Sequence, residues 1–172
     1  MIETKRFKLR EIEQTDINNI YKGLSDPKVV KYYDVSYASL EATQEQMDWY
    51  ANIKENETGI WWSIVDKKTE CFCGAGGYNG IEKRHQKGEI GFWLLPEYWG
   101  KEIMKEVMPL LFKYGFETLG LNRIEVYVQH NNKNCKKALE KLTLHFEGTL
   151  REWEIKDGQF IDVDLYSKIR TK

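Results

Sequence analysis

Several features that mark special classes of protein are scarce in this sequence. Its 172 residues include only 3 prolines, and the formal net charge is −1. Few prolines and a hydrophobic fraction of 41% argue against a disordered chain, because enough apolar surface can be buried to offset the entropy lost on folding. The balanced charge removes the main electrostatic reason to expect a nucleic-acid partner.

Long apolar segments and paired cysteines are also missing. No run approaches the roughly 18 apolar residues of a membrane helix. The first ten residues do not resemble a signal peptide, so we expect a cytoplasmic protein without a membrane partner. Cys71, Cys73 and Cys135 are an odd number, which suits reduced thiols. No second Cys/His pair stands at zinc-site spacing from Cys71 and Cys73, so we predict strand residues there and no metal.

The pattern of the chain predicts one domain over residues 1–172, with a core at 6–168, because no repeat or linker interrupts it. A first strand is expected at 6–12, followed by helices at 16–24 and 39–52. Aromatic and β-branched runs separated by turns then predict an antiparallel meander of strands at 59–66, 71–80 and 89–95.

The second half predicts a crossover between parallel strands. A helix over 99–119, with Pro109 inside it, precedes a β-branched strand at 123–128. A helix at 132–142 and two long strands joined by a KDG turn complete the chain. The expected fold is therefore α/β, with a mixed and mostly antiparallel sheet around a central parallel pair. Ligands of such sheets favour the carboxyl ends of the parallel strands, here after Leu95 and Val128.

An anion site is expected where the helix after Leu95 opens. A helix beginning at Gly100 leaves its first amides without intrahelical partners, and its dipole adds about half a positive charge. Lys101 and Lys105 add positive charge beside those amides. A phosphate or pyrophosphate is the natural ligand of such a corner, although glycine and lysine are common at helix starts.

The order of several motifs resembles the GNAT superfamily of N-acetyltransferases, in particular the RimJ/RimL type that acetylates protein N-termini. The motifs are EIGFWLLPEYWGK, LGLNRIEV, NKNCKKALEKL, FEG and GQFIDVDLY, and the resemblance covers nearly the whole chain. It implies a GNAT-like single domain in which the central parallel pair splays apart. It also implies acetyl-CoA as the cofactor and a primary amine as the acetyl acceptor.

The resemblance also assigns the cofactor contacts. The pyrophosphate would lie on backbone amides of the turn, and the pantetheine arm would pair with the splayed strand like an added strand. A contact to pantetheine from the next helix opening is an alternative to helix capping for Asn132. The implied cofactor-binding residues are Phe92, Trp93, Leu94, Leu95, Trp99, Gly100, Lys101, Glu102, Ile103, Met104, Asn132 and Cys135.

Two positions depart from the family pattern. Glu102 stands where glycine or alanine is usual, and in a first helical turn its side chain would tilt toward the phosphates. The repulsion would be on the order of 1 kcal/mol at 4 Å in water, so we expect weaker cofactor binding unless Glu102 turns toward Lys101 or Lys105. The second departure, Thr143, should alter only the exit of a helix.

Acetyl transfer to an amine requires a neutral nucleophile, a stabilised oxyanion and a protonated thiolate. The backbone amide near Leu94 is the expected oxyanion donor. The resemblance places Cys135 at the serine of an NxxS motif near the sulfur. Cys135 is then either the general acid or a side chain that fills space beside the thioester, and a covalent acetyl intermediate is a third option.

The base is assigned by resemblance to the strand after FEG, where it falls on Glu154. Regular alternation would place Glu152 on the same face as Glu154, so the pattern alone does not choose between them. Glu89, at the start of the central strand, is the alternative. The three histidines, His85, His130 and His145, are expected to be exposed. Candidates to line an acceptor groove are Tyr32, Tyr33, Trp61, Trp62 and Trp153.

The sequence therefore predicts an acetyl-CoA-dependent N-acetyltransferase that moves an acetyl group directly to a primary amine. The acceptor is either a protein N-terminus or a small amine, because no motif in the early helices distinguishes them. The rival prediction is a non-catalytic acetyl-CoA-binding or protein-interaction domain of the same fold, which Glu102 and Cys135 would favour. No heptad or self-pairing element is present, so a homo-oligomer remains open.

Overall fold

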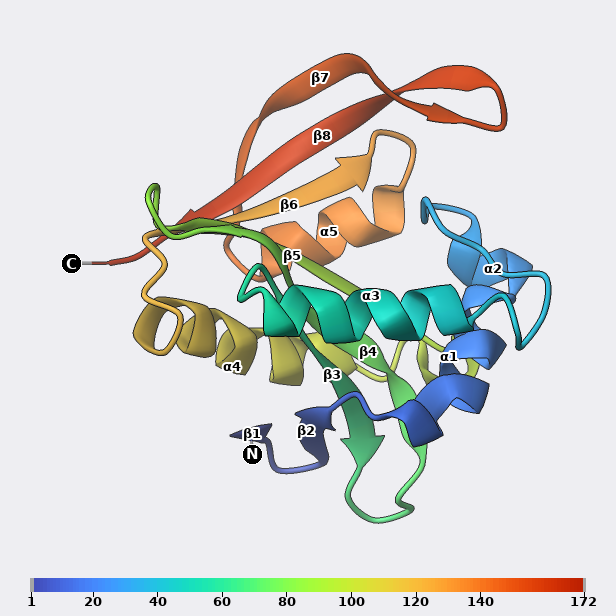
Figure 1. The fold of residues 1–172 in the computed structure, drawn as a ribbon. Coiled ribbons are helices and arrows are strands. Elements are labelled where there is room, and N and C mark those ends of the chain that lie inside the picture. Colours follow the sequence, from blue (N-terminus) through green and yellow to red (C-terminus); the bar gives the residue numbers. More distant parts are fainter. Residues whose placement is uncertain (1, 172) are drawn as a thin grey trace.

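The computed structural model describes residues 2–171, which fold around one eight-stranded sheet (Figure 1). The strands lie in the order β1-β2-β3-β4-β5-β6-β8-β7. Their bounds are β1 Ile2–Glu3, β2 Phe7–Glu11, β3 Ile60–Asp66, β4 Phe72–Glu82, β5 Lys87–Leu94, β6 Arg123–Gln129, β7 His145–Lys156 and β8 Gln159–Ile169. The helices are α1 Ile17–Leu24, α2 Pro27–Val30, α3 Gln44–Glu55, α4 Ile103–Glu117 and α5 Lys133–Lys141, with 3-10 turns η1 Gln14–Asp16 and η2 Pro96–Tyr98.

The sheet confirms the predicted mixed topology. Strands β3, β4 and β5 form the antiparallel meander, and β6 lies parallel to β5 after the α4 crossover. The remaining neighbours pair antiparallel. Among residues 2–171, none of the helices combines the length and the apolar character needed to cross a bilayer.

Each face of the sheet has its own apolar cluster. Helices α4 and α5 contribute Val107, Met108, Leu111 and Leu139 to the first cluster, which they form with strand residues such as Ile124. The second cluster lies under α1 and α3 and is a separate body of buried side chains, including Ile20, Leu24, Met47, Tyr50 and Trp93. Each fully buried aliphatic side chain contributes roughly 1.5–3 kcal/mol. These layers fix the sheet between two sets of helices.

Helix α4 begins four residues later than predicted. Pro96 opens η2, and Gly100 and Glu102 then have φ values of 72° and 58°, so the chain turns through left-handed conformations before Ile103. Such values interrupt a right-handed helix. The sequence suggested that Glu102 lies inside the first turn of the helix. In the structure Glu102 instead precedes the helix, at its N-cap position.

Two other boundaries differ from the predictions. Helix α3 begins at Gln44, because residues 39–43 form a turn in which Ser39 Oγ accepts the Ala42 amide. Strand β1 and the short helix α2 were not predicted. Asp26 caps α2 by accepting the Lys28 amide, and Pro27 occupies its first position, where the missing amide proton costs nothing.

Asp16 stands at the N-cap position of α1, but its side chain does not cap the helix and is a buried link between β2, η1 and β3. Its carboxylate accepts two 2.7 Å bonds from Arg10 and one of 3.1 Å from Ser63. Burial alone would raise the pKa of Asp16, but the bonds from Arg10 and from the Glu13 amide outweigh it and hold the pKa below its usual value. This link anchors the start of α1 to the sheet.

Strand β7 contains an irregularity that breaks its alternation. Leu150 pairs with Val163 and Glu154 with Ile161, so residues 151–153 face the single residue Asp162. Glu152 has φ 52° within this bulge. The predicted equivalence of Glu152 and Glu154 does not hold, because Glu152 is exposed whereas Glu154 is half-buried. The bulge bends the end of the β7–β8 hairpin away from a flat sheet (Figure 1).

Candidate functional site

A gap opens between the two parallel strands at the centre of the sheet. Strands β5 and β6 pair at Lys87–Arg123, Gly88–Ile124 and Glu89–Glu125, and the described residues show no further pairing between them. Beyond that point β5 stays with β4, and β6 stays with β8 to Gln129. The edge of β5 that faces the gap therefore carries backbone groups without strand partners. This is the splayed pair that the family resemblance implied.

The hydrogen-bond parity of β5 decides which backbone groups face the gap. The Leu95 amide donates to the Cys73 carbonyl at 2.9 Å, so odd-numbered residues of this segment bond to β4. The amides and carbonyls of Phe92 and Leu94 accordingly point toward the gap. Trp93 and Leu95 bury their side chains in the second apolar cluster instead. Of the four predicted strand contacts, two therefore present backbone groups to a ligand.

The Trp99 side chain hydrogen-bonds to one of these backbone groups, the Leu94 carbonyl. Its indole Nε1 donates to the Leu94 carbonyl at 2.8 Å, while 48% of the residue remains exposed. The Leu94 amide remains directed into the gap. The predicted oxyanion donor is thus on the correct edge of β5.

The start of α4 lies at the open end of the gap and presents the predicted amides. Ile103 and Met104 occupy the first helical positions, where amides have no intrahelical carbonyl to bond. Arg6 reaches this corner from the start of β2, donating to the Lys101 carbonyl at 3.1 Å and to Glu106 at 2.7 Å. A cavity of about 290 Å³ is lined by Arg6, Glu102, Lys105 and Glu106. The corner thus combines free amides with three cationic side chains, including Lys101, and two carboxylates.

Glu102 is turned away from the helix axis, as one of the sequence alternatives proposed. Its side chain is 70% exposed and lies 3.2 Å from the Lys105 ammonium. Its backbone adopts a left-handed conformation, which is costly for any residue with a Cβ and favours glycine. The strain explains physically why glycine suits this position.

Replacing Glu102 with Gly should tighten acetyl-CoA binding about two- to tenfold, because it removes a negative charge near the diphosphate. Titration calorimetry of the variant and the wild type measures the change. Glu117→Gln, at the far end of α4, removes one negative charge at a distance and is the control. An unchanged or weaker affinity of the Glu102→Gly protein would contradict the repulsion argument.

The opposite wall of the gap is formed by the start of α5. Asn132 Oδ1 accepts the Cys135 amide at 3.1 Å, so the capping alternative for Asn132 is confirmed. Cys135 packs against the first apolar cluster, and burial raises the pKa of its thiol to about 12. A thiol with such a pKa releases its proton reluctantly. This direction favours packing over general acid among the options for Cys135.

Glu89 lies at the last paired position of β5, where the two strands begin to diverge. Burial raises the pKa of its carboxyl to about 7, and although a hydrogen bond from Asn79 opposes this, Asp34 and Glu154 add to it. A carboxyl with this pKa is poised to accept a proton at neutral pH. Glu89 is therefore the better placed of the two candidate bases.

Glu154 approaches the same region from β7. Burial and the nearby Asp34 raise its pKa, although Lys156 opposes the shift. The two carboxylates belong to segments 120 residues apart in sequence, so their proximity could not be predicted from spacing. Together with Glu89 they make this side of the gap acidic.

Tyr33 is the aromatic candidate that the fold brings to the gap. A Cβ on Gly91 of β5 would lie 3.7 Å from the Tyr33 hydroxyl. Burial raises the pKa of Tyr33 well above its usual value, and Tyr50, Glu89 and Cys135 add to the shift. Tyr33 thus lies beside β5, and Glu89 and Cys135 are both near enough to act on the charge of its hydroxyl. The sequence had indicated Tyr33 only as one of five aromatic residues that could line an acceptor groove.

Trp61 lies across the sheet beside this point. The same Cβ on Gly91 would approach Cη2 of Trp61 to 3.0 Å, and one on Gly77 would approach Cγ to 2.6 Å. Both glycines therefore leave room for the indole. Of the other predicted aromatics, Trp62 packs edge-on against Tyr114 of α4, and Trp153 stacks on Tyr127 of β6. Tyr32 lies under the Lys31 ammonium.

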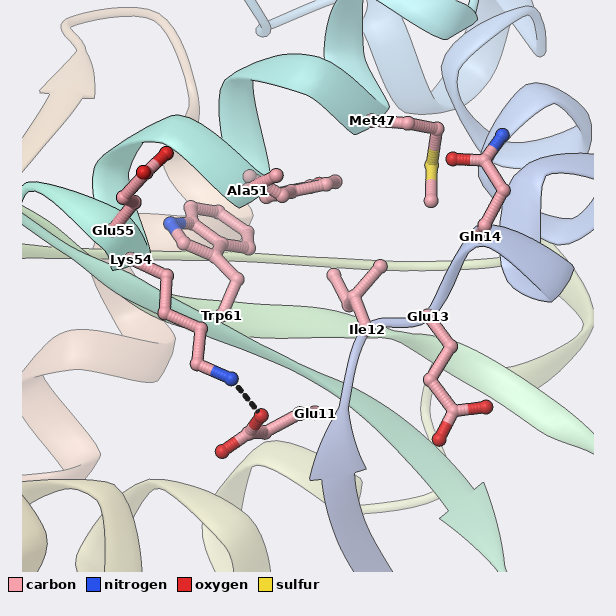
Figure 2. A pocket seen from close by; sticks show the side chains of 10 residues that line it. Glu11, Ile12, Glu13, Gln14, Met47, Ala51, Lys54, Glu55 and Trp61 are labelled. Carbon is pink, nitrogen blue, oxygen red and sulfur yellow. Dashed lines mark hydrogen bonds and ion pairs between the residues drawn. The ribbon is translucent and has the colours of Figure 1, made fainter.

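Trp61 also lines a larger cavity of about 490 Å³, between α3 and the segment that joins β2 to α1 (Figure 2). The figure shows Ile12, Met47 and Trp61 around an apolar floor, with Glu13 and Glu55 at the rim and an ion pair between Lys54 and Glu11. This cavity is separate from the gap between β5 and β6. The Trp61 ring joins the two regions, because its outer edge reaches Gly91.

The histidines remain outside this arrangement. His85 and His145 are exposed, as predicted. His130 is also exposed, as predicted, and its Nδ1 lies 2.9 Å from the buried Asp164 carboxylate, which Lys136 also contacts at 2.7 Å. None of them faces Glu89 across the gap in a contact that the structure shows among the described residues.

Comparison with known proteins agrees with this geometry. Residues 6–145 match the acetyltransferase (GNAT) domain family. The uncharacterized N-acetyltransferase YoaA of Bacillus subtilis is 30% identical over 100% of this chain and 98% of its own length.

Two solved structures share the fold. A RimL ribosomal-protein α-N-acetyltransferase, in complex with coenzyme A joined to one of its cysteines by a disulfide, superimposes with a TM-score of 0.86 at 18% identity, covering 96% of this chain and 95% of that one. A Vibrio cholerae spermidine N-acetyltransferase in complex with coenzyme A and spermine gives 0.85 at 21% identity, covering 95% of each chain. From its sequence match, its splayed strand pair and its α4 corner, the chain belongs to the GNAT family of acetyl-CoA-dependent N-acetyltransferases.

Proposed function

We propose that this chain transfers an acetyl group directly from acetyl-CoA to a primary amine that approaches the gap from the side of Glu89 and Glu154. The observation that carries the proposal is the position of Glu89. Its carboxyl has a pKa of about 7 and lies where β5 and β6 diverge, beside the backbone edge that can hold a thioester.

The residues of the chain fit the cofactor at three places. The amides of Ile103 and Met104 suit the diphosphate, since they lack intrahelical acceptors. The backbone groups of Phe92 and Leu94 suit the amides of the pantetheine arm, and the Trp99 indole would leave the Leu94 carbonyl as they pair. Bound acetyl-CoA supplies the thioester carbonyl that the amine attacks and the thiolate that leaves.

The acid–base roles follow from the surroundings of each group. Glu89 takes the proton that the amine loses as its nitrogen bonds to the acetyl carbon. The Leu94 amide donates to the oxyanion as the carbon becomes tetrahedral. The Tyr33 hydroxyl, beside Gly91 of β5, hydrogen-bonds the leaving thiolate and keeps its own proton, because burial raises its pKa well above the usual value; the thiolate then takes a proton from water. Cys135 shapes the space beside the sulfur, and Glu154 holds the cationic acceptor.

Other activities reported for similar proteins define the acceptors to test. The RimL structure belongs to an enzyme of ribosomal-protein N-termini, and the Vibrio cholerae structure to an enzyme of spermidine. Both acceptors are primary amines. A cytoplasmic location is part of the proposal, because the exposed Cys71 and the half-buried Cys135 are free thiols.

The experiment is a binding titration with acetyl-CoA, followed by measurement of thiol release over linear polyamines, amino acids, amino sugars and N-terminal peptides. We expect micromolar binding and turnover with at least one amine. Binding without turnover on any amine would instead support the non-catalytic domain. Absence of binding at millimolar acetyl-CoA would overturn the proposal.

A further inference from the structure

The end of the β7–β8 hairpin crosses the acceptor side of the gap. We use the name strap for residues 151–161, which include the bulge of β7 and the turn at Asp157 and Gly158. Although β8 lies between β7 and β6 in the sheet, the Trp153 ring of β7 stacks on Tyr127 of β6. Their centroids are 6.5 Å apart and their planes differ by 7°. The bulge thus lets the strap fold back over β6.

The far end of the strap is tied to the other side of the gap. Lys156 Nζ donates to the Val30 carbonyl at 3.1 Å and to the Tyr33 carbonyl at 2.5 Å. These bonds join residues more than 120 positions apart. Val30 is the last residue of α2, so the ammonium lies at the C-terminal end of this short helix, where a cation is favoured. Figure 1 shows the hairpin end and α2 on the same side of the molecule.

The strap is therefore held at two places, by a contact with β6 and by bonds to the segment around the end of α2. One place is β6, through Tyr127, and the other is the segment after α2, through Tyr33. The Tyr33 hydroxyl in turn lies beside β5, 3.7 Å from the position that a Cβ on Gly91 would take. The strap thus spans from β6 to the segment that carries Tyr33, on the side of the gap where Asp34 and Glu154 lie near Glu89.

We propose that the strap restricts the acceptor to a narrow linear aliphatic amine, and that Lys156 is the residue that sets this limit. The inference rests on the proposed function, because it concerns the acceptor of that same site. An N-terminus whose folded body follows within a few residues is too wide to pass beneath a segment fixed at both ends. An extended chain of methylene and amine groups can. Asp34 and Glu154, which lie near Lys156, attract the cationic form of such an amine.

The first test measures access to Cys135 and does not depend on turnover. The Cys71→Ser substitution removes the exposed thiol and leaves the half-buried Cys135 and the buried Cys73. Peptide mass spectrometry then shows which of these two cysteines carries the label. The rates of labelling by iodoacetamide and by a polyethylene-glycol maleimide are measured, and their ratio is compared between proteins. Lys156→Met should raise the ratio of the maleimide rate to the iodoacetamide rate at least tenfold, because it removes the bonds from Lys156 to Val30 and Tyr33.

Two variants serve as controls. Lys156→Arg keeps the charge and the donors, and should retain the ratio of the parent protein. Lys68→Met removes an exposed lysine in the turn between β3 and β4, and should leave the ratio unchanged. If the ratio of labelling rates is equal in Lys156→Met and its parent, the strap does not restrict access and the inference is overturned.

The second test measures acceptor choice. The unaltered protein should acetylate linear diamines and polyamines with kcat/KM at least a hundredfold above that for the N-terminus of a folded protein, and Lys156→Met should narrow this difference tenfold or more. Equal rates for both acceptors in the unaltered protein would overturn the inference and leave the proposed function standing. If no amine is acetylated by any variant, the proposed function fails, while the labelling ratio still decides whether the strap exists.

Discussion

Glu89→Gln should lower kcat/KM for the acceptor amine by about 10²- to 10⁴-fold, the range typical of a lost general base. The amide keeps the shape of the side chain and its contact with Asn79, but it takes up no proton at neutral pH. Binding of acetyl-CoA should remain within about twofold, because the diphosphate and pantetheine contacts lie elsewhere. Steady-state kinetics and calorimetry on the same preparation measure both quantities.

The pH dependence gives the sign of the effect. With a folded-state pKa of about 7, Glu89 is protonated and inactive as a base at pH 5–6 and becomes ionised above pH 7. The kcat/KM of the unaltered enzyme should therefore rise through pH 7, and Glu89→Gln should lose that ascending limb. Glu154→Gln is the matched comparison, since it would take over this behaviour if Glu154 were the base.

The stability of the same variant separates a lost base from a lost fold. The pKa of Glu89 is about 7 when folded and near 4.5 when unfolded, so the unfolded chain binds fewer protons between these values. The free energy of unfolding therefore falls as the pH rises from 4.5 to 7 and stays low above that. Glu89→Gln escapes this loss and should be more stable at pH 8, by on the order of 1–3 kcal/mol. Near-normal turnover or a lower denaturation midpoint at pH 8 would contradict the assignment.

Gly74→Ala should destabilise the protein by about 3 kcal/mol or more, a cost typical of severe overpacking. A Cβ at this position would lie 2.2 Å from the Trp93 carbonyl oxygen and 2.8 Å from the Leu94 Cα. Both atoms belong to the backbone of β5, which cannot move without breaking its pairing with β4. Urea denaturation followed by tryptophan fluorescence measures the loss.

The matched control is Gly76→Ala, two residues further along β4. Its Cβ would meet no atom closer than 3.4 Å, so it should cost about 1 kcal/mol or less. Because Gly74 pairs with Leu94, acetyl-CoA affinity of any folded Gly74→Ala protein should also fall. Equal stability of the two variants would show that β4 and β5 can separate locally, contrary to the packing described here.

The predictions that succeeded from sequence rest on local patterns. The alternation and aromatic content of residues 59–66 and 89–95 gave the meander, and the β-branched strand after a long helix gave the parallel pair. Boundaries failed where a few residues take unusual dihedrals. Glu102 is the clearest case, since a glutamate beside a helix gives no sign that its φ is positive.

The site was only partly accessible from sequence. The α4 corner and the backbone edge of β5 could be located, because each is formed by consecutive residues. The acidic side could be located only in part: Glu89 and Glu154 were named as alternative bases, but their proximity to each other and to Asp34 joins three distant segments. The choice between Glu89 and Glu154 depended on burial, which raises the pKa of Glu89 to about 7 and is a property of the packed structure.

The sequence by itself determined the family, the cofactor class and the order of the longer strands and helices, because periodicity and motif order are encoded between near neighbours. The tertiary structure alone decided how the acceptor side is built. The curl of the β7–β8 hairpin, the contact of Lys156 with the segment after α2, and the place of Tyr33 beside Gly91 join residues up to 126 positions apart. Such contacts follow from how the sheet twists and how two apolar layers pack, which no local pattern records.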